Sequence, residues 1–192
     1  MDFKDFQWVN GAQHNVTEDG IEIFAPKGSE YFVHPGNGDV NTSAPFFYQW
    51  VEGDFVLRAR VSLAFVSTFD AGVLLAVDHD NLWAKACFER TDFDTHSVVT
   101  VMTNGLSDDA NGYNVEGQEV WLQLARKDDI FATHYSLDGE RYIMARLCNL
   151  PMQKRIKVGL EAQSPIGEGA LIHFKDVSLE LRGLEDIRGG NC

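Results

Sequence analysis

Two ionisable residues on one short segment, Lys85 and Glu89, are the first candidates for chemistry in this sequence. They lie in LWAKACFER, residues 82–90, where Trp83, Lys85, Cys87 and Glu89 alternate with alanine and phenylalanine. This alternation predicts a β-strand with all four side chains on one face. Residues four apart on a strand lie roughly 13 Å apart at ~3.3 Å per residue. Lys85 and Glu89 therefore cannot pair with each other, and each needs a partner on a neighbouring strand or a ligand.

Other predicted strands place further polar side chains on their outward faces, namely Arg58, Arg60, Glu161 and Gln163. If these strands neighbour the segment 82–90 in one sheet, all six side chains line a polar groove. Within this groove Glu161 would meet Lys85, and one of the two arginines would meet Glu89. The alternative is a lattice of cross-strand ion pairs on an exposed sheet, where each pair contributes little.

Aromatic side chains on the same faces offer surfaces on which a sugar ring can stack. Trp83 and Trp121 both fall on predicted outer faces, and Trp83 lies two residues from Lys85. The alternative for either ring is packing in the core or at the end of a sheet. We take Trp83 as the predicted stacking platform of the groove.

Glu89 is also the best single candidate for a catalytic residue. Hydrolysis of a glycosidic bond needs two carboxyl groups about 5–5.5 Å apart for retention or ~6.5–9.5 Å apart for inversion. Asp92 follows closely in the sequence, but it points to the opposite face if the strand is straight. Glu161, on a neighbouring strand, is an alternative second carboxyl. The sequence therefore indicates Glu89 as one member of a catalytic pair and leaves the second member open.

Metal ions and cofactors have no clear signature in this sequence. The acidic segments DHDN (78–81) and SDD (107–109) contain the oxygen ligands that calcium prefers, but neither has the glycine and distal glutamate of an EF-hand loop. We interpret the first as a hairpin turn and the second as a loop whose side chains bond its own backbone. The six histidines show no zinc-binding spacing. We predict no metal and no cofactor.

Composition limits the partners that this protein can take. The 192 residues include 16 basic and 29 acidic side chains, a net charge of −13, which repels phosphate backbones and anionic membrane surfaces. No segment has the roughly 18 apolar residues of a membrane span, and the N-terminus does not resemble a signal peptide. Cys87, Cys148 and Cys192 are predicted free thiols of a reducing compartment. We predict a cytoplasmic protein with no nucleic-acid or membrane partner, and leave a homo-oligomer open.

Alternation with a period of two extends over most of the chain and defines the elements that position these residues. It is clearest in the segments 53–65, 119–126, 155–163 and 171–181. Turn signals separate such segments, and no long stretch has helical spacing. Many short strands with polar turns predict an all-β fold, a two-sheet antiparallel sandwich of the jelly-roll type. We expect one domain over residues 1–192, with 184–192 as a loose C-terminal tail.

Six segments carry a resemblance to a known family: FQWVN, EGDFVLRARV, DAGVLLAVDHDNLWAKACFE, SVVTVMTNGLSDD, VWLQLARKDDIFATHYSLDGERY and VGLEAQSPIGEGALIHFKDVSLEL. In order and spacing they resemble the bacterial and fungal proteins grouped as domain of unknown function 1349. The resemblance implies the concanavalin A-like lectin/glucanase sandwich. It also implies that the lysine and glutamate at 85 and 89 belong to the family's pattern. The broader superfamily handles carbohydrates, which by fold analogy favours a sugar ligand.

Two features depart from this resemblance. Family members commonly place an aspartate and an aromatic pair before the first long strand, whereas residues 29–50 here form a longer segment that contains glycines. Laminarinase-like members of the superfamily carry E-x-D-x-x-E on one strand, and that pattern is absent here.

The sequence therefore predicts a carbohydrate-associated protein with a binding or accessory role in glycan metabolism. Its polar groove would take an oligosaccharide or a small sugar ligand. One alternative is a glycoside-processing enzyme that uses Glu89 and a second carboxylate. Another alternative is a structural or oligomerising module without a small ligand.

Overall fold

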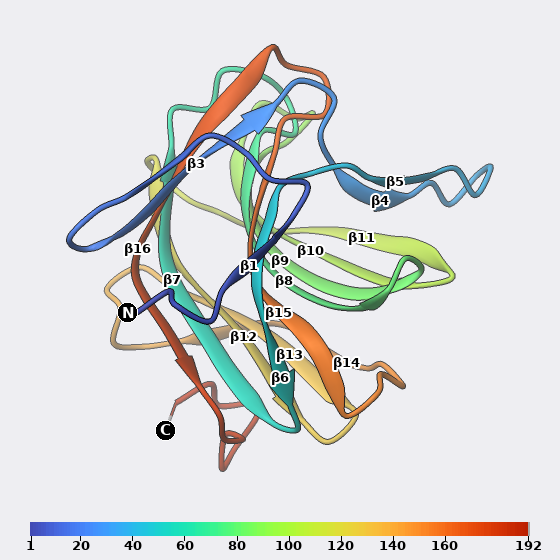
Figure 1. The fold of residues 1–192 in the computed structure, drawn as a ribbon, viewed down its shortest axis with the longest axis vertical. Coiled ribbons are helices and arrows are strands. Elements are labelled where there is room, and N and C mark those ends of the chain that lie inside the picture. The colour runs from blue at the N-terminus through green and yellow to red at the C-terminus, as the bar shows by residue number, and fades with distance from the viewer. Residues whose placement is uncertain (192) are drawn as a thin grey trace.

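Sixteen β-strands form the regular structure of the computed structural model, which describes residues 1–191 (Figure 1). The described residues contain no helix, and so none that is long and apolar enough to cross a membrane. The strands are β1 (Gln7–Val9), β2 (His14–Val16), β3 (Gly20–Pro26), β4 (Tyr31–Val33), β5 (Val40–Thr42), β6 (Phe46–Glu52), β7 (Phe55–Leu63), β8 (Ala71–His79), β9 (Leu82–Arg90), β10 (His96–Asn104), β11 (Leu106–Asn114), β12 (Glu119–Lys127), β13 (Ile130–Ser136), β14 (Ile143–Asn149), β15 (Arg155–Gln163) and β16 (Gly169–Glu180).

Two seven-stranded antiparallel sheets form a sandwich, as the sequence predicted. The first sheet has the order β1-β6-β15-β8-β9-β10-β11, and the second has the order β14-β13-β12-β7-β16-β3-β2. A separate two-stranded hairpin, β4–β5, lies alongside the first sheet (Figure 1). The strands that carry Lys85 and Glu161 are both in the first sheet, with β8 between them.

The main core fills the space between the two sheets. Strand β7 contributes Leu57, Ala59 and Val61, which are the inward residues that its alternation predicted. Strand β9 contributes Ala84 and Phe88, so its other face, which holds Lys85 and Glu89, points away from this core. The period of two thus assigned these faces correctly because only one face of each strand meets the opposing sheet.

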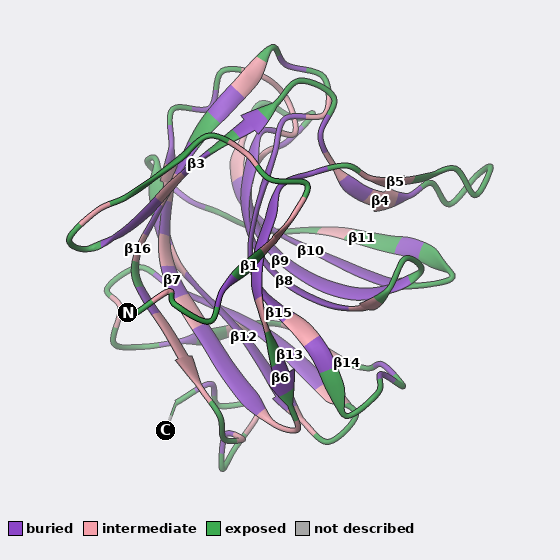
Figure 2. Cartoon of the chain, viewed as in Figure 1, coloured by how far each residue is buried: buried purple, intermediate pink, exposed green. Residues whose placement is uncertain are grey.

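A second buried layer covers the outer face of the first sheet, where the sequence predicted a polar groove open to solvent. Tyr31 and Val33 of β4 pack with Val73, Leu75 and other apolar residues of that face. Strand β9 is consequently buried at its first eight positions, and Figure 2 shows β8–β10 buried along most of their length. The covering segment, strands β4 and β5, lies within the glycine-bearing region 29–50 that departs from the family outline, and the last residues of that region belong to β6 of the sheet itself. The apolar residues of the covering segment lie far from their sheet partners in the sequence, so alternation alone could not reveal the contact.

The end of the chain packs against the outer face of the second sheet, whereas the sequence predicted a loose tail. Leu184 is buried with Val56 and Ala125. Burial lowers the pKa of His134 to about 4, so the neutral ring holds the tail through a hydrogen bond of 3.0 Å between its Nε2 and the carbonyl of Ile187. The prediction of free thiols is confirmed for Cys87 and Cys148, and Cys192 lies outside the described residues.

The two acidic segments have different outcomes. DHDN, residues 78–81, comprises the end of β8 and the two-residue turn that leads into β9, so the predicted hairpin is present. SDD, residues 107–109, is part of strand β11 and not a loop, because it pairs in register with Met102, Val101 and Thr103 of β10. Within residues 1–191 no group of three or more histidine, cysteine or acidic side chains is arranged to hold a metal ion.

The packing of the tail predicts that Leu184→Ala will destabilise the protein. Truncation of a buried leucine leaves a cavity and typically lowers the free energy of unfolding by about 2–5 kcal/mol. We expect a value near the lower end, since the cluster around Leu184 is small. Leu181→Ala is the matched control, because Leu181 is 68% exposed, and should change the free energy by less than about 0.5 kcal/mol. Equal effects of both substitutions in urea unfolding would contradict the packed tail.

Candidate functional site

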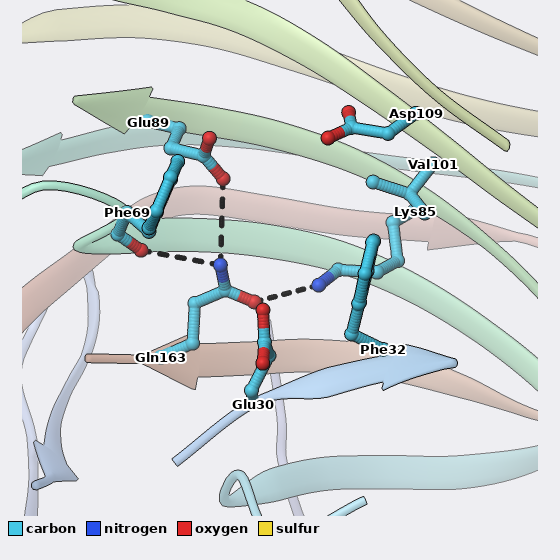
Figure 3. A pocket seen from close by; sticks show the side chains of 8 residues that line it. All are labelled: Glu30, Phe32, Phe69, Lys85, Glu89, Val101, Asp109 and Gln163. Carbon is cyan, nitrogen blue, oxygen red and sulfur yellow. Dashed lines mark hydrogen bonds between the residues drawn. The ribbon is translucent and has the colours of Figure 1, made fainter. Parts of the chain in front are cut away.

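A pocket of about 130 Å³ lies at one end of the layer between the β4–β5 segment and the first sheet (Figure 3). Sheet strands β9, β10, β11 and β15 form its floor and one wall, and residues 30, 32 and 69 close it from the other sides. It is lined by Glu30, Phe32, Phe69, Lys85, Glu89, Val101, Asp109 and Gln163. Its volume is below the roughly 300–1,000 Å³ of sites for drug-sized molecules, so it suits a compact ligand.

The ammonium group of Lys85 is buried and fully engaged by the protein. Its Nζ donates to the carbonyl oxygen of Tyr31 at 3.1 Å and to Oε1 of Gln163 at 2.6 Å. It also lies 3.7 Å from Oε2 of Glu161. Burial alone lowers the pKa of Lys85, but the negative charge of Glu161 and weaker neighbouring charges raise it by more. Lys85 therefore stays charged and joins three segments of the chain.

Gln163 continues this network from Lys85 to Glu89. Its Nε2 donates to the carbonyl of Phe69 at 3.2 Å and to Oε2 of Glu89 at 3.4 Å (Figure 3). Every polar atom of the Gln163 amide thus has a protein partner. The other carboxyl oxygen of Glu89, Oε1, receives no hydrogen bond from the described residues and is left for a ligand in the pocket.

The corner at Phe69 is held in an unusual backbone conformation. Phe69 has φ of 67°, a left-handed conformation that is costly for a bulky residue and concentrates at functional sites. Asp70 stabilises this corner, because its carboxylate accepts from the backbone of Ser67 at 2.7 Å and from the hydroxyl of Ser164 at 2.7 Å. This conformation directs the carbonyl of Phe69 to Gln163 and its ring to the pocket.

Two carboxyl groups beside Lys85 have raised pKa values. Burial raises the pKa of Glu89 to about 8, against the opposing effect of Lys85. Burial raises the pKa of Glu161 to about 7, again opposed by Lys85. Glu89 is therefore mostly protonated at neutral pH and can donate a hydrogen bond as well as accept one. Neither oxygen of Glu161 has a hydrogen-bond partner, so this carboxyl depends on the ion pair.

Two further carboxyls stand at the sides of the pocket. Burial also raises the pKa of Glu30 and of Asp109, although Lys85 lowers both. Glu30 is partly buried, and Asp109 is exposed at the mouth of the pocket. The pocket thus collects acidic side chains around one lysine.

The structure brings together four of the predicted site residues. Lys85, Glu89 and Gln163 line the pocket, and Glu161 lies directly behind Lys85 as its ion-pair partner, as the sequence predicted. Glu161 is 0% exposed and is not among the residues that line the pocket. Its place is to compensate the charge of Lys85 and not to contact a ligand.

Arg58 and Arg60 lie elsewhere, so the prediction that they share a groove with Lys85 is wrong. Both belong to β7 of the second sheet, and their side chains are on its outer face. Arg58 contacts Glu180 at 3.3 Å, and Arg60 pairs with Glu119 at 3.2 Å and Asp176 at 2.9 Å. The alternation was correct for both residues, but alternation does not say which sheet a strand joins.

Trp83 lies on the predicted face but is 0% exposed, so it offers no ring for stacking. The ring of Tyr31 covers it, with the ring centroids 5.6 Å apart in an edge-on arrangement. The alternative, packing in a core, is therefore the correct one for Trp83. The aromatic walls of the pocket are instead Phe32 and Phe69.

Sequence reasoning missed four residues of this pocket, namely Glu30, Phe32, Phe69 and Asp109. In the sequence Asp109 stands out only as part of the acidic segment SDD. Its position on β11, opposite Val101 of β10, places it two strands away from Lys85 on the same face, because Val101 in turn pairs with Lys85. Glu30 and Phe32 lie in the segment 29–50, whose departure from the family outline was the available signal.

The raised pKa values predict that the protein is less stable at alkaline than at mildly acidic pH. Glu89 has a pKa of about 8 in the folded protein against its ordinary value of 4.5, so the folded state binds more protons than the unfolded state between these values. The free energy of unfolding then falls as the pH rises from about 4.5 to 8. Glu89→Gln removes this contribution and should flatten the decline.

Urea unfolding at several pH values measures this effect. Glu168→Gln, which removes an exposed carboxylate, controls for the change in net charge. A free energy of unfolding that rises between pH 5 and 8 by the same amount in the wild type, in Glu89→Gln and in Glu168→Gln would refute the assignment of a protonated Glu89.

Known proteins share both the sequence pattern and the fold. The family model described as "Protein of unknown function (DUF1349)" matches residues 8–181. "Regulation of enolase protein 1" of Saccharomyces cerevisiae is 25% identical over 176 residues, which are 90% of this chain and 87% of that protein.

Solved structures extend the similarity in fold. A functionally unknown protein from Saccharomyces cerevisiae superposes with a TM-score of 0.87 at 21% identity, over 94% of this chain and 98% of that chain. The carbohydrate binding module CBM66 from Bacillus subtilis does so with a TM-score of 0.59 at 11% identity, over 92% and 95%. The concanavalin A-like sandwich also occurs in structures of GH43 glycoside hydrolases. With the family model covering most of the sequence, this chain belongs to the DUF1349 family.

Proposed function

We propose that this protein binds a compact, hydroxyl-rich ligand of the sugar class in the pocket beside Glu89. The observation that carries the proposal is the buried carboxyl of Glu89, which is fixed by Gln163 and has one oxygen free toward the cavity. A protonated carboxyl both donates and accepts, which matches the hydroxyl groups of a sugar. The carbohydrate-binding module of the same fold supports this ligand class by analogy.

The shape of the site favours one sugar unit over an oligosaccharide. The β4–β5 segment fills the middle of the outer face, where Tyr31 and Val33 are buried. A long glycan would need a continuous open groove on that face. The phenyl rings of Phe32 and Phe69 offer apolar walls against which the C–H groups of a single sugar ring can pack.

A second function, glycoside processing, is favoured by the protonation of Glu89. A carboxylic acid with a pKa near 8 is suited to act as a general acid at neutral pH. The second carboxyl would be Asp109 or Glu30, which line the pocket, and not the enclosed Glu161. Catalysis would need the second carboxyl in a fixed position, and neither Asp109 nor Glu30 is held by an ion pair. We therefore prefer binding over catalysis.

We also propose that the protein is cytoplasmic. Its net charge of −13 supports the exclusion of nucleic acid and of anionic membranes as partners. The yeast relative is named for regulation of enolase. A protein that binds a small metabolite without converting it is compatible with a regulatory role of that kind.

Isothermal titration calorimetry with a panel of monosaccharides tests the binding function. We expect Glu89→Gln to weaken binding of the preferred sugar several-fold, because a hydrogen bond of a neutral group contributes roughly 0.5–1.5 kcal/mol. Arg60→Gln is the matched control on the opposite sheet and should bind as the wild type does. Equal binding by wild type and Glu89→Gln would remove Glu89 from the site.

Nitrophenyl glycosides of the same sugars test the second function. For a binding protein we expect no release of nitrophenol above the rate in buffer. Release by the wild type that is lost in Glu89→Gln, and retained in Arg60→Gln, would establish glycoside processing instead.

A further inference from the structure

The carboxyl groups around the pocket have no cationic partner of their own. Glu30, Glu89 and Asp109 line the cavity, and no ion pair of the described residues includes any of the three. The neighbouring Asp108 differs, since it pairs with Arg146 at 3.0 Å. Asp109 therefore differs from its neighbour in facing the cavity without an ion pair.

The single cation that lines the pocket does not compensate these groups. Lys85 donates to Tyr31 and Gln163 and forms an ion pair with Glu161, and the amide of Gln163 is also used by the protein. What the cavity offers a ligand is thus mainly carboxyl oxygen. An occupant must bring hydrogen-bond donors, and an anion would meet one committed lysine among four carboxyl groups.

The charges of these groups act on one another. Asp109, Glu30 and Glu161 each disfavour the ionised form of Glu89, while Lys85 favours it. A positive charge placed between Glu30, Glu89 and Asp109 relieves this repulsion, because an opposite charge within about 4–6 Å stabilises the ionised carboxylate. The faces of Phe32 and Phe69 add a surface that attracts a cation.

We propose that the ligand of this pocket carries a protonated primary amine, held among Glu30, Glu89 and Asp109, as in an amino sugar. The inference rests on the proposed function for its sugar ring and goes beyond it in naming the charged group. The amine donates its three N–H bonds to the free carboxyl oxygens, and the ring hydroxyl groups reach the remaining acceptors.

Calorimetric titration with three matched sugars tests the amine. Glucosamine carries the ammonium group, N-acetylglucosamine replaces it with a neutral amide, and glucose replaces it with a hydroxyl. We expect glucosamine to bind at least tenfold more tightly than the other two, and this preference to shrink at high salt. Equal affinities for all three sugars would overturn the inference and leave the proposed function standing.

Two variants on adjacent residues separate the site from the general acidity of the protein. Asp109→Asn removes a carboxylate that lines the pocket and should lower the affinity for glucosamine several-fold, with little effect on glucose. Asp108→Asn removes the same charge from the neighbouring residue, which is paired with Arg146, and should change neither affinity. Equal losses in both variants would attribute the effect to net charge and overturn the site.

Proton release supplies an independent readout. At pH 7 Glu89 is mostly protonated, and an ammonium group beside it favours the ionised form, so binding of glucosamine should release protons. The binding enthalpy then varies with the ionisation enthalpy of the buffer, and the variation should decrease in Glu89→Gln. The groups that act on Glu89 from the surrounding elements are Lys85, Asp109, Glu30 and Glu161, and all remain in that variant. A buffer-independent enthalpy in the wild type would contradict the placement of the amine.

Putrescine, a diamine without a sugar ring, distinguishes the source of the amine. Binding of putrescine without binding of any sugar would retain the amine and refute the sugar class. Binding of glucosamine alone supports both proposals, and no binding of putrescine or of any of the three sugars would refute both.

Discussion

The buried ammonium group of Lys85 is the constraint on which the outer layer of this protein depends. A charge that is removed from water must be compensated, and Lys85 obtains this from the carbonyl of Tyr31, the amide of Gln163 and the carboxyl of Glu161. These three groups come from the covering segment and from β15. Because the charge of Lys85 must be compensated, its hydrogen bond to Tyr31 fixes the position of the covering segment over the sheet. The same contact fixes the wall of the pocket that this segment forms.

The geometry of the pocket continues from this point through Gln163. Because one end of its amide is committed to Lys85, the other end must face the carbonyl of Phe69 and the carboxyl of Glu89. The partner of Glu89 is the neutral amide of Gln163, whereas an ion-pair partner would have kept the carboxyl charged. Burial therefore raises the pKa of Glu89. Glu161 has the lysine and yet no hydrogen bond. The two carboxyls near Lys85 thus differ in role. Glu161 compensates the charge of Lys85, and Glu89 is placed to contact a ligand.

The sequence was sufficient for the faces of the strands and insufficient for their neighbours. Alternation placed Leu57 and Val61 in the core and Lys85 and Glu89 on one outer face, because side-chain direction is a local property of a strand. Arg58 had the same outward pattern as Glu161 but joined the other sheet, since strand order follows from contacts between segments that are distant in sequence. The burial of that outer face escaped prediction for the same reason.

The covering segment also explains how a fold shared with carbohydrate-binding modules can present an enclosed pocket. An open outer face would leave Glu89 in water, where a carboxyl near its ordinary pKa is charged at neutral pH and strongly hydrated. The packing of Tyr31 and Val33 over Trp83 and its neighbours on the sheet removes that water and leaves only one end of the face accessible. The layer that excludes a long chain of sugars from this face is thus the same one whose burial of Glu89 raises the pKa of that carboxyl.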